Sequence, residues 1–520
     1  MSTTAIWWIR RDLRLTDNSA LQAALAQAAT VVPVFILDDA ALDSRYHRRA
    51  QMRKDFLFGG LHALDAGLRA CGSQLLVRHG EPVSVLRTLL AECGAASIFA
   101  EADCTPFAVR RDAAVAQVLP LTLTGGLTIH PPQAVRKGDG TPYTVFTPYS
   151  RTWRALPLPR SALAAPKTLG AIPKLTSLPI PAAAPLALFP PGEAEAQRRL
   201  KRFAKSAIYK YADGRNQLDV EGTSALSAYL RFGMLSARSA LQAARLAAAA
   251  AEGAAARQGA DTWITELIWR EFYIAILHHF PHVLQMAFRA DLRNVAWDKN
   301  SETLAAWQTG NTGYPVVDAA MRQLAATGWM HNRARMIVSS FLVKDLLQDW
   351  RLGEAWFMDK LVDGDPAANN GGWQWSAGVG TDAAPYFRVF SPVLQGQKFD
   401  PHGSFVRAWV PELARMPLKF LQQPWLAPAD VQAAAGCRVG RDYAAPVVDH
   451  AFARARVLAA YKRAKSCRGR VAVGCGGGAL VLVQFATRPD AKAERWQFRC
   501  VSFLQPDAMA AGARIYPVRK

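Results

Sequence analysis

The spacing of apolar residues changes once along this chain, and that change limits the folds it can adopt. Up to about residue 130, short apolar runs alternate with helical patterns. The strand-like runs are AIWWIR (5–10), VVPVFIL (31–37), QLLVRHG (74–80) and SIFAEA (97–102), and the helical segments are LHALDAGLRA (61–70) and VSVLRTLLAEC (83–93). This alternation predicts a parallel sheet with crossover helices, an α/β domain that spans residues 1–130.

The end of the first strand bears on what this domain binds. Arg10 and Arg11 follow the strand where a dinucleotide-binding Rossmann domain has a glycine-rich phosphate loop, so that kind of site is not supported. Thr16, Asp17 and Asn18 come next and can cap the following helix.

A proline-rich connector separates this part from the rest. Residues 156–191 hold nine prolines, a density that excludes regular helices and sheet ladders. We therefore expect an interdomain linker within residues 131–195. The apolar spacing is helical from about 193 onward, which predicts an all-helical domain over residues 196–465. Residues 466–520 are interpreted as a C-terminal extension of unknown role.

The charge balance indicates the class of partner. Lysines and arginines number 62 against 41 acidic residues, for a formal net charge of +21. A folded chain this basic points to a polyanion, and DNA leads, although basic drift in a proteome rich in alanine and arginine would give the same balance. The seven cysteines form no CxxC pair, so neither zinc nor a disulfide framework is expected. No signal peptide or membrane-length apolar run is found, which predicts a cytoplasmic protein.

The stretch 329–382 concentrates residue types that a binding site uses and a plain core avoids. Asn332, Arg335 and Met336 stand at i, i+3 and i+4, so a helix places them on one face. A turn-rich polar passage follows, and two closely spaced tryptophans end it. Acidic, amide and guanidinium groups beside large aromatic rings suit a pocket for a large, flat ligand with polar edges.

Five further motifs carry a resemblance to a known family. They are WWIRRDLRLTDNSAL (7–21), EGTSALSAYLRFG (221–233), TELIWREFY (265–273), TGYPVVDAAMRQLAATGWMHNR (312–333) and TDAAPYFRVFSPVLQGQKFDP (381–401). Through them residues 5–465 resemble the cryptochrome/photolyase family, and the pattern is most similar to bacterial class I cyclobutane pyrimidine dimer photolyases. The resemblance implies an α/β antenna domain followed by an all-helical domain that holds FAD in a U-shaped conformation.

The resemblance also implies a set of FAD-binding residues. They are Tyr211, Thr223, Ser224, Ala225, Leu226, Ser227, Arg335, Asp363, Gly364, Asp365 and Asn369. Hydroxyl and N–H groups at a helix start can hold the diphosphate, although a plain N-cap has the same residues. Arg335 is expected to pair with Asp363 beside the flavin ring. Asn369 is expected to face flavin N5, where an amide forms a hydrogen bond without supplying a ready proton.

The substrate side is implied in the same way. Glu266 matches a carboxyl group that bonds the bases of a dimer flipped out of the duplex. Trp269 lies on the same helical face and can stack against a pyrimidine. The other predicted contacts to the lesion or the DNA backbone are Arg215, Arg270, Asn332, Arg333, Met336, Trp375, Arg388 and Gln395. A lone arginine is more often a solvated surface residue than a DNA contact. The surrounding motifs favour the DNA contact here.

Tryptophans are unusually dense in the helical part, because nine of the fifteen lie between residues 263 and 375. The resemblance assigns Trp297, Trp350 and Trp373 to a chain that passes electrons from the surface to photoexcited oxidised flavin. Core packing is the alternative for any one of them. Packing is our interpretation for Trp307, Trp329 and Trp356.

The antenna chromophore is less defined. Folate-binding members of the family have an Asn–Glu pair where this chain has Phe107 and Ala108. A deazaflavin is therefore expected rather than methenyltetrahydrofolate, and a protein without an antenna chromophore stays open.

The C-terminal extension contains one motif with a known meaning. GCGGGA (474–479) matches the dinucleotide fingerprint G-x-G-x-x-A by its letters. LVLVQFATRP (480–489) after it is strand-like rather than helical, so no βαβ unit fits. Some cryptochromes signal through such extensions.

These features predict a light-driven enzyme in which reduced FAD donates an electron to a cyclobutane pyrimidine dimer and the ring splits. UV-damaged double-stranded DNA is the expected partner of a monomeric protein. A photosensory cryptochrome is the alternative, against which Asn369 and the substrate set argue. Repair of (6-4) photoproducts expects a histidine pair, whereas Asn332 follows His331 here. Action on single-stranded DNA stays open. The histidines lack the spacing of metal ligands, so no metal is expected.

Overall fold

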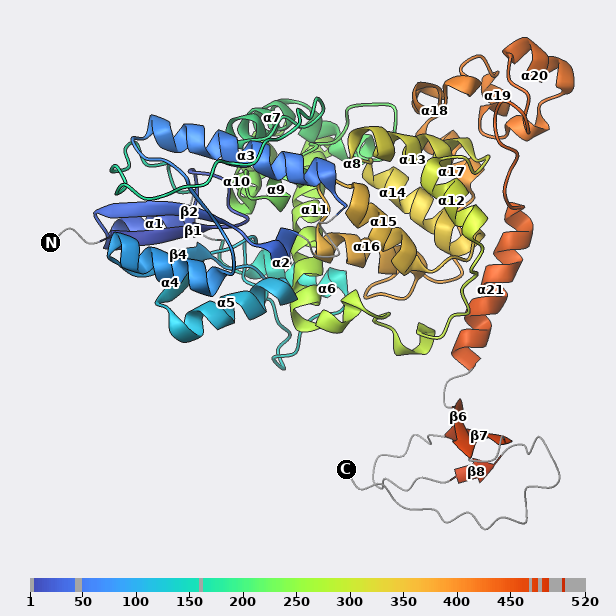
Figure 1. Ribbon diagram of the computed structural model, residues 1–520. Coiled ribbons are helices and arrows are strands. Elements are labelled where there is room, and N and C mark those ends of the chain that lie inside the picture. Colours follow the sequence, from blue (N-terminus) through green and yellow to red (C-terminus); the bar gives the residue numbers. More distant parts are fainter. Residues whose placement is uncertain are drawn as a thin grey trace.

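The computed structural model describes residues 4–42, 49–158 and 162–466, together with the backbone of three strands between residues 470 and 500. The N-terminal part is a five-stranded parallel sheet in the order β3-β2-β1-β4-β5 (Figure 1). Its strands are β1 (Thr4–Ile9), β2 (Thr30–Leu37), β3 (Leu76–His79), β4 (Ala95–Glu101) and β5 (Leu121–Thr124). The predicted α/β domain with a parallel sheet is confirmed.

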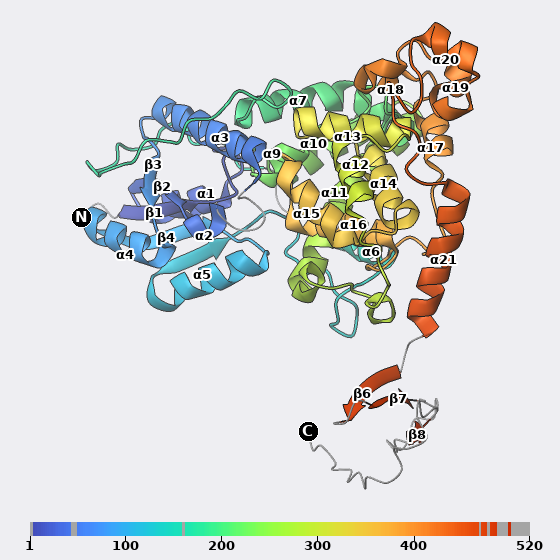
Figure 2. The ribbon, with the colours of Figure 1, turned by 45° about the vertical axis from the view of Figure 1, so that its right-hand side comes forward.

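Helices cover both faces of this sheet (Figures 1 and 2). The helices of this part are α1 (Ser19–Gln27), α2 (Asp39–Leu42), α3 (Gln51–Ala70), α4 (Pro82–Cys93) and α5 (Pro106–Val118). Trp7 of β1 packs in a cluster with residues of α1 and α3, whereas Trp8 packs in a cluster with residues of α4 and α5. A strand buried on both faces has no polar side, which explains its continuous apolar run. Asn18 accepts a hydrogen bond from the backbone N of Leu21 at 2.9 Å and caps α1, as expected.

The connector is irregular, as its prolines predict. The described residues within 156–191 contain no helix or strand. The predicted linker range of 131–195 is too wide, because it includes helix α6 (Phe146–Ala155) and the start of the helix at Glu193. The connector runs along the α/β domain, where the backbone N of Leu169 donates to the Cys71 carbonyl at 2.6 Å. Leu178 donates in the same way to Val77 at 3.0 Å. The connector therefore extends the sheet domain's surface instead of spanning open solvent.

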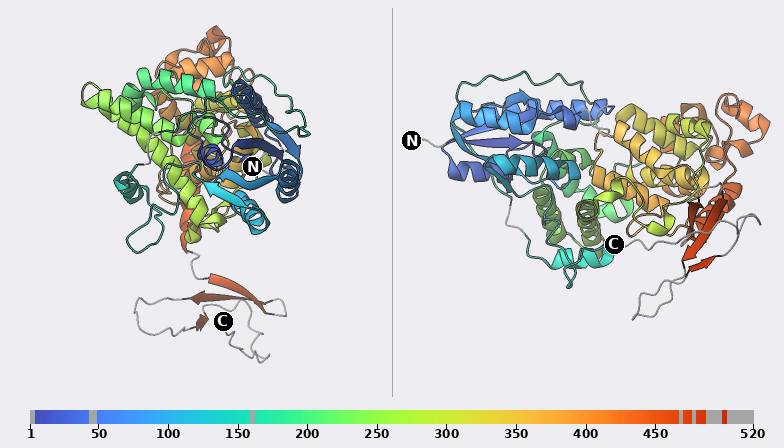
Figure 3. Two further views of the ribbon diagram at one scale, coloured as in Figure 1. Left: turned by 90° about the vertical axis from the view of Figure 1, so that its left-hand side faces the viewer. Right: turned by 60° about the horizontal axis from the view of Figure 1, so that its bottom comes forward.

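From Glu193 to Ser466 the chain is helical, which confirms the predicted all-helical part (Figure 3). The α-helices are α7 (Glu193–Lys205), α8 (Tyr211–Gly214), α9 (Ser227–Arg231), α10 (Ala237–Ala250), α11 (Ala254–His279), α12 (Ser301–Thr309), α13 (Pro315–Thr327), α14 (Asn332–Ser340), α15 (Trp350–Lys360), α16 (Pro366–Ala377), α17 (Pro392–Phe399), α18 (Ser404–Trp409), α19 (Leu418–Leu421), α20 (Ala429–Ala435) and α21 (His450–Ser466). The shorter helical turns are η1 (Ala207–Lys210), η2 (Pro281–Leu284), η3 (Ala290–Leu292), the π-helical η4 (Phe341–Asp345), η5 (Pro411–Leu413) and η6 (Pro424–Leu426).

Helix α11, 26 residues long, runs through the middle of the molecule (Figure 1). The apolar cluster that contains Trp7 of β1 continues through α3, α9, α10 and α11, so the sheet and the helices share one core. This continuity fixes α11 against both halves of the chain. None of the helices in the described residues is long and apolar enough to cross a membrane.

After α21 the chain forms a separate three-stranded antiparallel sheet in the order β6-β7-β8 (Figure 1). Its strands are β6 (Arg470–Cys475), β7 (Ala479–Phe485) and β8 (Phe498–Cys500). The segment 480–485 is a strand, as its sequence predicts. The strands β6 and β7, which contain the two ends of GCGGGA, pair antiparallel and do not form a βαβ unit. Residues 476–478 of that motif lie outside the described residues.

Candidate active site

A cavity of about 480 Å³ opens among α8, α9, α11, α14, α15 and α16. Its size is typical of ligand and cofactor sites. Sixteen of the residues predicted from sequence line it: Tyr211, Arg215, Ser224, Ser227, Glu266, Trp269, Arg270, Asn332, Arg335, Met336, Asp363, Gly364, Asp365, Asn369, Trp373 and Trp375. The predicted residues outside its lining are Thr223, Ala225, Leu226, Trp297, Arg333, Trp350, Arg388 and Gln395.

Helix α16 supplies one wall of the cavity, and Asp365 fixes where it begins. The Asp365 carboxylate accepts hydrogen bonds from the backbone N of Ala367 and Ala368 at 2.9 and 3.3 Å, and proline follows at the first helical position. From this start Asn369 and Trp373 stand four residues apart, so both reach the cavity from one face.

Three glycines show how closely this wall is packed on one side and how open it is on the other. A Cβ on Gly353 would lie 2.0 Å from the ring of Trp373, and a Cβ on Gly371 would lie 2.1 Å from the ring of Tyr273. A Cβ on Gly372 would meet nothing within 4 Å, because Gly372 lines the cavity. The helix therefore leaves room for a flat ligand on its cavity side only.

The predicted ion pair between Arg335 and Asp363 is present. Arg335 Nη2 lies 2.8 Å from Asp363 Oδ2, and the aspartate side chain is 3% exposed. Arg335 Nε also donates to the Met330 carbonyl at 2.9 Å, which holds the guanidinium in place. The buried Oδ1 of Asp363 has no hydrogen-bond partner among the described residues, so it is available to a ligand.

Asn369 is oriented by the backbone beside it. Its Nδ2 donates to the carbonyl of Glu354 at 2.9 Å, and the side chain is almost fully buried. This bond uses one amide N–H and leaves the second N–H and the carbonyl oxygen for a ligand. A neutral amide in that position brings no acidic proton.

Asp365 also joins the cavity to the sheet domain. Its Oδ2 lies 2.6 Å from Arg11 Nη2, at the end of β1, and 3.6 Å from Arg231 Nε. Burial alone would raise the pKa of Asp365, but Arg11, Arg231 and Arg270 outweigh it and hold that pKa well below its usual range. Arg270, predicted to contact the lesion or the DNA, lines the cavity and donates to the carbonyls of Leu127 and Leu230 at 2.6 and 3.3 Å.

Two predicted substrate residues already have protein partners. Glu266 forms an ion pair with Arg215, and both side chains are partly exposed at the cavity. The indole of Trp269 stacks on Phe146 with the ring centroids 3.6 Å apart and the planes 4° from parallel. One face of this tryptophan is thus covered, which leaves less of the ring for a pyrimidine than the sequence suggested.

The three tryptophans predicted to transfer electrons lie at different depths. Trp373 lines the cavity, and its ring centroid lies 5.0 Å from that of Phe357 and 6.0 Å from that of Trp307. Trp350 is buried, while Trp297 is partly exposed and packs edge-on against Tyr461. Exposure therefore increases from Trp373 and Trp350 to Trp297. This order is compatible with the predicted electron-transfer chain, which stays a prediction.

Comparison with known proteins agrees with this geometry. The model for the FAD binding domain of DNA photolyase matches residues 263–463, and the DNA photolyase model matches residues 5–167. The deoxyribodipyrimidine photo-lyase of Escherichia coli is 40% identical over 482 residues, which cover 89% of this chain and 99% of that protein. The chain belongs to the DNA photolyase family.

Solved structures place this photolyase in the same fold. A class III photolyase from Agrobacterium tumefaciens superposes with a TM-score of 0.83 at 36% identity, over 90% of this chain and 98% of the other. An archaeal photolyase from Sulfolobus tokodaii, solved with two FAD molecules, gives 0.74 at 30% identity over 89% and 100% of the two chains.

The residues of the cavity fit FAD, the cofactor of this family. The unpartnered Asp363 Oδ1 and the spare groups of Asn369 can hydrogen-bond a polar ring edge. The open side of Gly372 accepts a flat ring, and Ser224 and Ser227 can hold phosphate oxygens at the start of α9.

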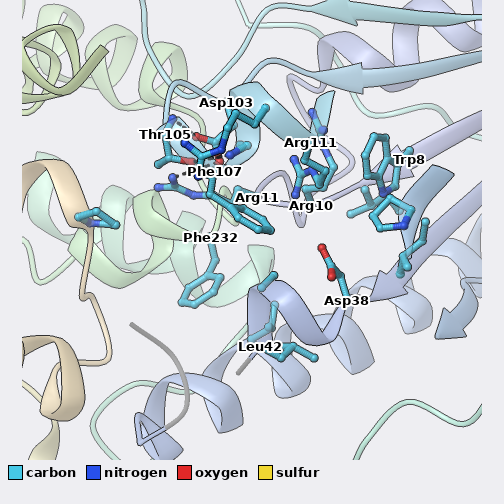
Figure 4. A pocket seen from close by; sticks show the side chains of 18 of the residues that line it. Trp8, Arg10, Arg11, Asp38, Leu42, Asp103, Thr105, Phe107, Arg111 and Phe232 are labelled. Atoms are coloured by element: carbon cyan, nitrogen blue, oxygen red, sulfur yellow. Dashed lines mark hydrogen bonds and ion pairs between the residues drawn. The ribbon is translucent and has the colours of Figure 1, made fainter. Parts of the chain in front are cut away.

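A second cavity, of about 330 Å³, lies at the carboxyl ends of β1, β2 and β4 (Figure 4). Open α/β sheets bind ligands at that edge, where the strand order reverses. The guanidinium groups of Arg10 and Arg111 lie 4.5 and 4.9 Å from the ring centroid of Trp8. Phe107 and Ala108 also line this cavity. An aromatic wall with arginines suits a flat, anionic ligand.

Several cavity residues were missed from the sequence, notably Trp263, Tyr273 and Arg231. In α11 the cavity residues are spaced by three, four and three positions, at Trp263, Glu266, Arg270 and Tyr273. The helical period could therefore have identified Trp263 and Tyr273 from the predicted Glu266 and Arg270. Arg231 lines both cavities. Burial and the charge of Arg11 lower the pKa of Arg231 to about 9. Its pairing with distant residues left no signal in the sequence.

Proposed function

We propose that this photolyase splits cyclobutane pyrimidine dimers in UV-damaged DNA when light excites its reduced FAD. One observation carries the proposal: a single cavity is lined by the predicted FAD-binding residues and by the predicted substrate residues. Its relatives named deoxyribodipyrimidine photo-lyase favour repair over a photosensory role.

Bound FAD supplies the light-driven electron donor. Around it, Asp363 and Arg335 form a neutral pair whose guanidinium can compensate a negative charge on the ring. The Asn369 amide binds the ring edge without giving up a proton. Glu266 and Trp269 orient the flipped dimer, and the surrounding aromatic side chains exclude water.

Repair of dimers in a defined duplex by chemically reduced protein tests this function. The expected result is restoration under blue light and none in the dark. Light-independent restoration, or none at all with FAD bound and reduced, would contradict the proposal.

The basic side chains predicted to contact DNA should make binding depend on salt. Each phosphate contact contributes a slope of about −0.9 to the logarithm of affinity against the logarithm of salt concentration. Replacing the exposed Arg388 with glutamine should reduce the slope by roughly one. Arg69→Gln, an equal charge change on α3 in the sheet domain, should leave it unaltered. Equal slopes for all three proteins would show that Arg388 makes no phosphate contact.

We further propose that the second cavity holds the antenna chromophore, a flat anionic molecule such as a deazaflavin. Its support is the arginine and aromatic lining: Arg10 and Arg111 lie over the ring of Trp8, Arg111 also lies over Phe107, and Arg110 lines the cavity beside them. With FMN as the probe, Arg110→Met in the holoprotein should weaken binding roughly tenfold, the loss of one charge-assisted bond. Arg87→Met is the control, because Arg87 is an exposed residue of α4 that does not line the cavity. Equal affinity in both variants would remove the assignment.

A further inference from the structure

The ion pair between Arg215 and Glu266 occupies a carboxylate that the proposed reaction needs. Arg215 directly follows α8, and Glu266 lies in the middle of α11. Their side chains are 35% and 31% exposed, and both line the cavity. A carboxylate held by a guanidinium can only accept hydrogen bonds. The carbonyl oxygens of a pyrimidine are acceptors too, so the paired Glu266 cannot bond them.

The charges at this edge of the cavity are unbalanced. Arg333 lies near Arg215, and its Nη2 donates to Asn216 Oδ1 at 2.5 Å. Burial and the charge of Arg215 lower the pKa of Arg333. Only Arg215 pairs with Glu266, and Arg333 adds a second guanidinium group close to Arg215. Two neighbouring guanidinium groups attract a phosphate.

The charge state of Glu266 is set by two opposing influences. Burial raises its pKa, and the charge and hydrogen bond of Arg215 lower it. The other titratable groups facing it are the phenols of Tyr211 and Tyr273, whose own pKa values burial raises, so they stay neutral. If Arg215 moves away, burial alone acts on Glu266 and raises its pKa further.

We propose that damaged DNA draws Arg215 from Glu266 to a backbone phosphate, and that Glu266 then takes up one proton from solvent and donates a hydrogen bond to the flipped base. This inference rests on the proposed function. The exchange ties recognition of the DNA backbone to readiness of the site, because Glu266 becomes a donor only after a phosphate has engaged Arg215.

The sign of the pH dependence follows from linkage. Arg215 lowers the pKa of Glu266 in the free protein. Its withdrawal in the proposed complex therefore raises that pKa, so binding takes up a proton between the two values and dimer DNA binds more tightly as pH falls through that window. Uptake disappears where Glu266 is protonated in both states or ionised in both.

Calorimetric titration of the FAD-loaded protein with a dimer-containing duplex, in buffers of different ionisation enthalpy, counts the protons taken up. The wild type should take up a proton, approaching one in the middle of the window. Glu266→Gln, whose amide is already a neutral donor, should still bind the dimer with no uptake. Zero uptake by the wild type, or equal uptake by Glu266→Gln, would overturn the inference.

Two arginine variants separate this exchange from a general effect of charge. Arg333→Gln should weaken binding roughly tenfold through one lost phosphate contact and keep the proton uptake. Arg215→Gln should weaken binding similarly and reduce the uptake, because Glu266 has lost its cation before DNA arrives. Failure to prefer dimer DNA over intact DNA would contradict the proposed function itself. A clear preference with no proton uptake would contradict only the exchange.

Discussion

Replacing Asp365 with alanine is expected to lower the free energy of unfolding by about 3–5 kcal/mol and to release FAD on desalting. The substitution removes the cap of α16 and takes the nearest carboxylate from two buried guanidinium groups, those of Arg231 and of Arg11, which keeps only the longer contact with Asp103. Because Asp365 lines the cavity, the same change displaces the wall that carries Asn369 and Trp373. Denaturant unfolding and the flavin absorbance that stays with the protein measure the two effects.

Asp349→Ala is the matched control. Asp349 caps α15 as Asp365 caps α16, but its partner Arg351 is a neighbouring residue whose side chain is 52% exposed. The expected cost is about 1 kcal/mol, that of a lost cap alone. If both variants lost the same stability, the buried pair with Arg11 would contribute nothing beyond the cap.

The same pair predicts how the effect of Asp365→Ala changes with pH. The depressed pKa of Asp365 means that its stabilising contribution is complete above the unfolded-state value of about 3.9 and is lost as pH falls towards the folded-state value. The difference in stability between wild type and variant should therefore be constant near neutral pH and shrink below about pH 4. A difference that grew in acid would show that Asp365 is not ionised in the fold.

The sequence predicts four of the five strands of the sheet and helix α3 only in part. The missed strand is β5 (Leu121–Thr124), an edge strand with no fully buried residue. Buried parallel strands leave an uninterrupted apolar run that needs no partner to be read. In α3 the predicted helix covers residues 61–70, whereas the helix begins at Gln51. Its first half contains Arg53, which is buried and donates to the Leu361 carbonyl at 3.0 Å, and Gly60, whose Cβ would lie 2.1 Å from Met234. The residue types at positions 53 and 60 depend on contacts with residues that are distant in the sequence, so a local pattern does not show that they belong to a helix.

In the candidate site, too, the local patterns were predictable from sequence and the contacts between distant residues were not. Residues on one helix, such as Glu266 and Trp269, could be grouped from their spacing, and the motifs supplied the pair of Arg335 with Asp363. The contact of Arg11 with Asp365 joins the first strand to a helix 354 positions later, and no local pattern records it. The stacking of Phe146 on Trp269 also joins residues that are far apart in the sequence. Sequence spacing gives which residues share an element, and packing decides what each one touches.

Replacing Trp373 with phenylalanine is expected to abolish the light-driven reduction of bound oxidised flavin while FAD stays bound. Trp373 is 2% exposed, lines the cavity and has no hydrogen-bond partner for its Nε1 among the described residues. Phenylalanine keeps an aromatic ring against Gly353 and Phe357 but lacks the easily oxidised indole. The decay of oxidised flavin absorbance under blue light with an external reductant measures the effect, and repair by chemically reduced protein should persist.

Trp307→Phe makes this test specific, because Trp307 is as deeply buried as Trp373 and its ring lies 6.0 Å away. If Trp350 is the next carrier, Trp307→Phe keeps light-driven reduction, and any loss of stability from the smaller ring is of the usual size for core truncation, about 1–3 kcal/mol. If Trp307→Phe also stops the reduction in a folded, FAD-loaded protein, the electron leaves Trp373 through Trp307. The residue interpreted from sequence as packing would then be the carrier, and the chain through Trp350 would be wrong.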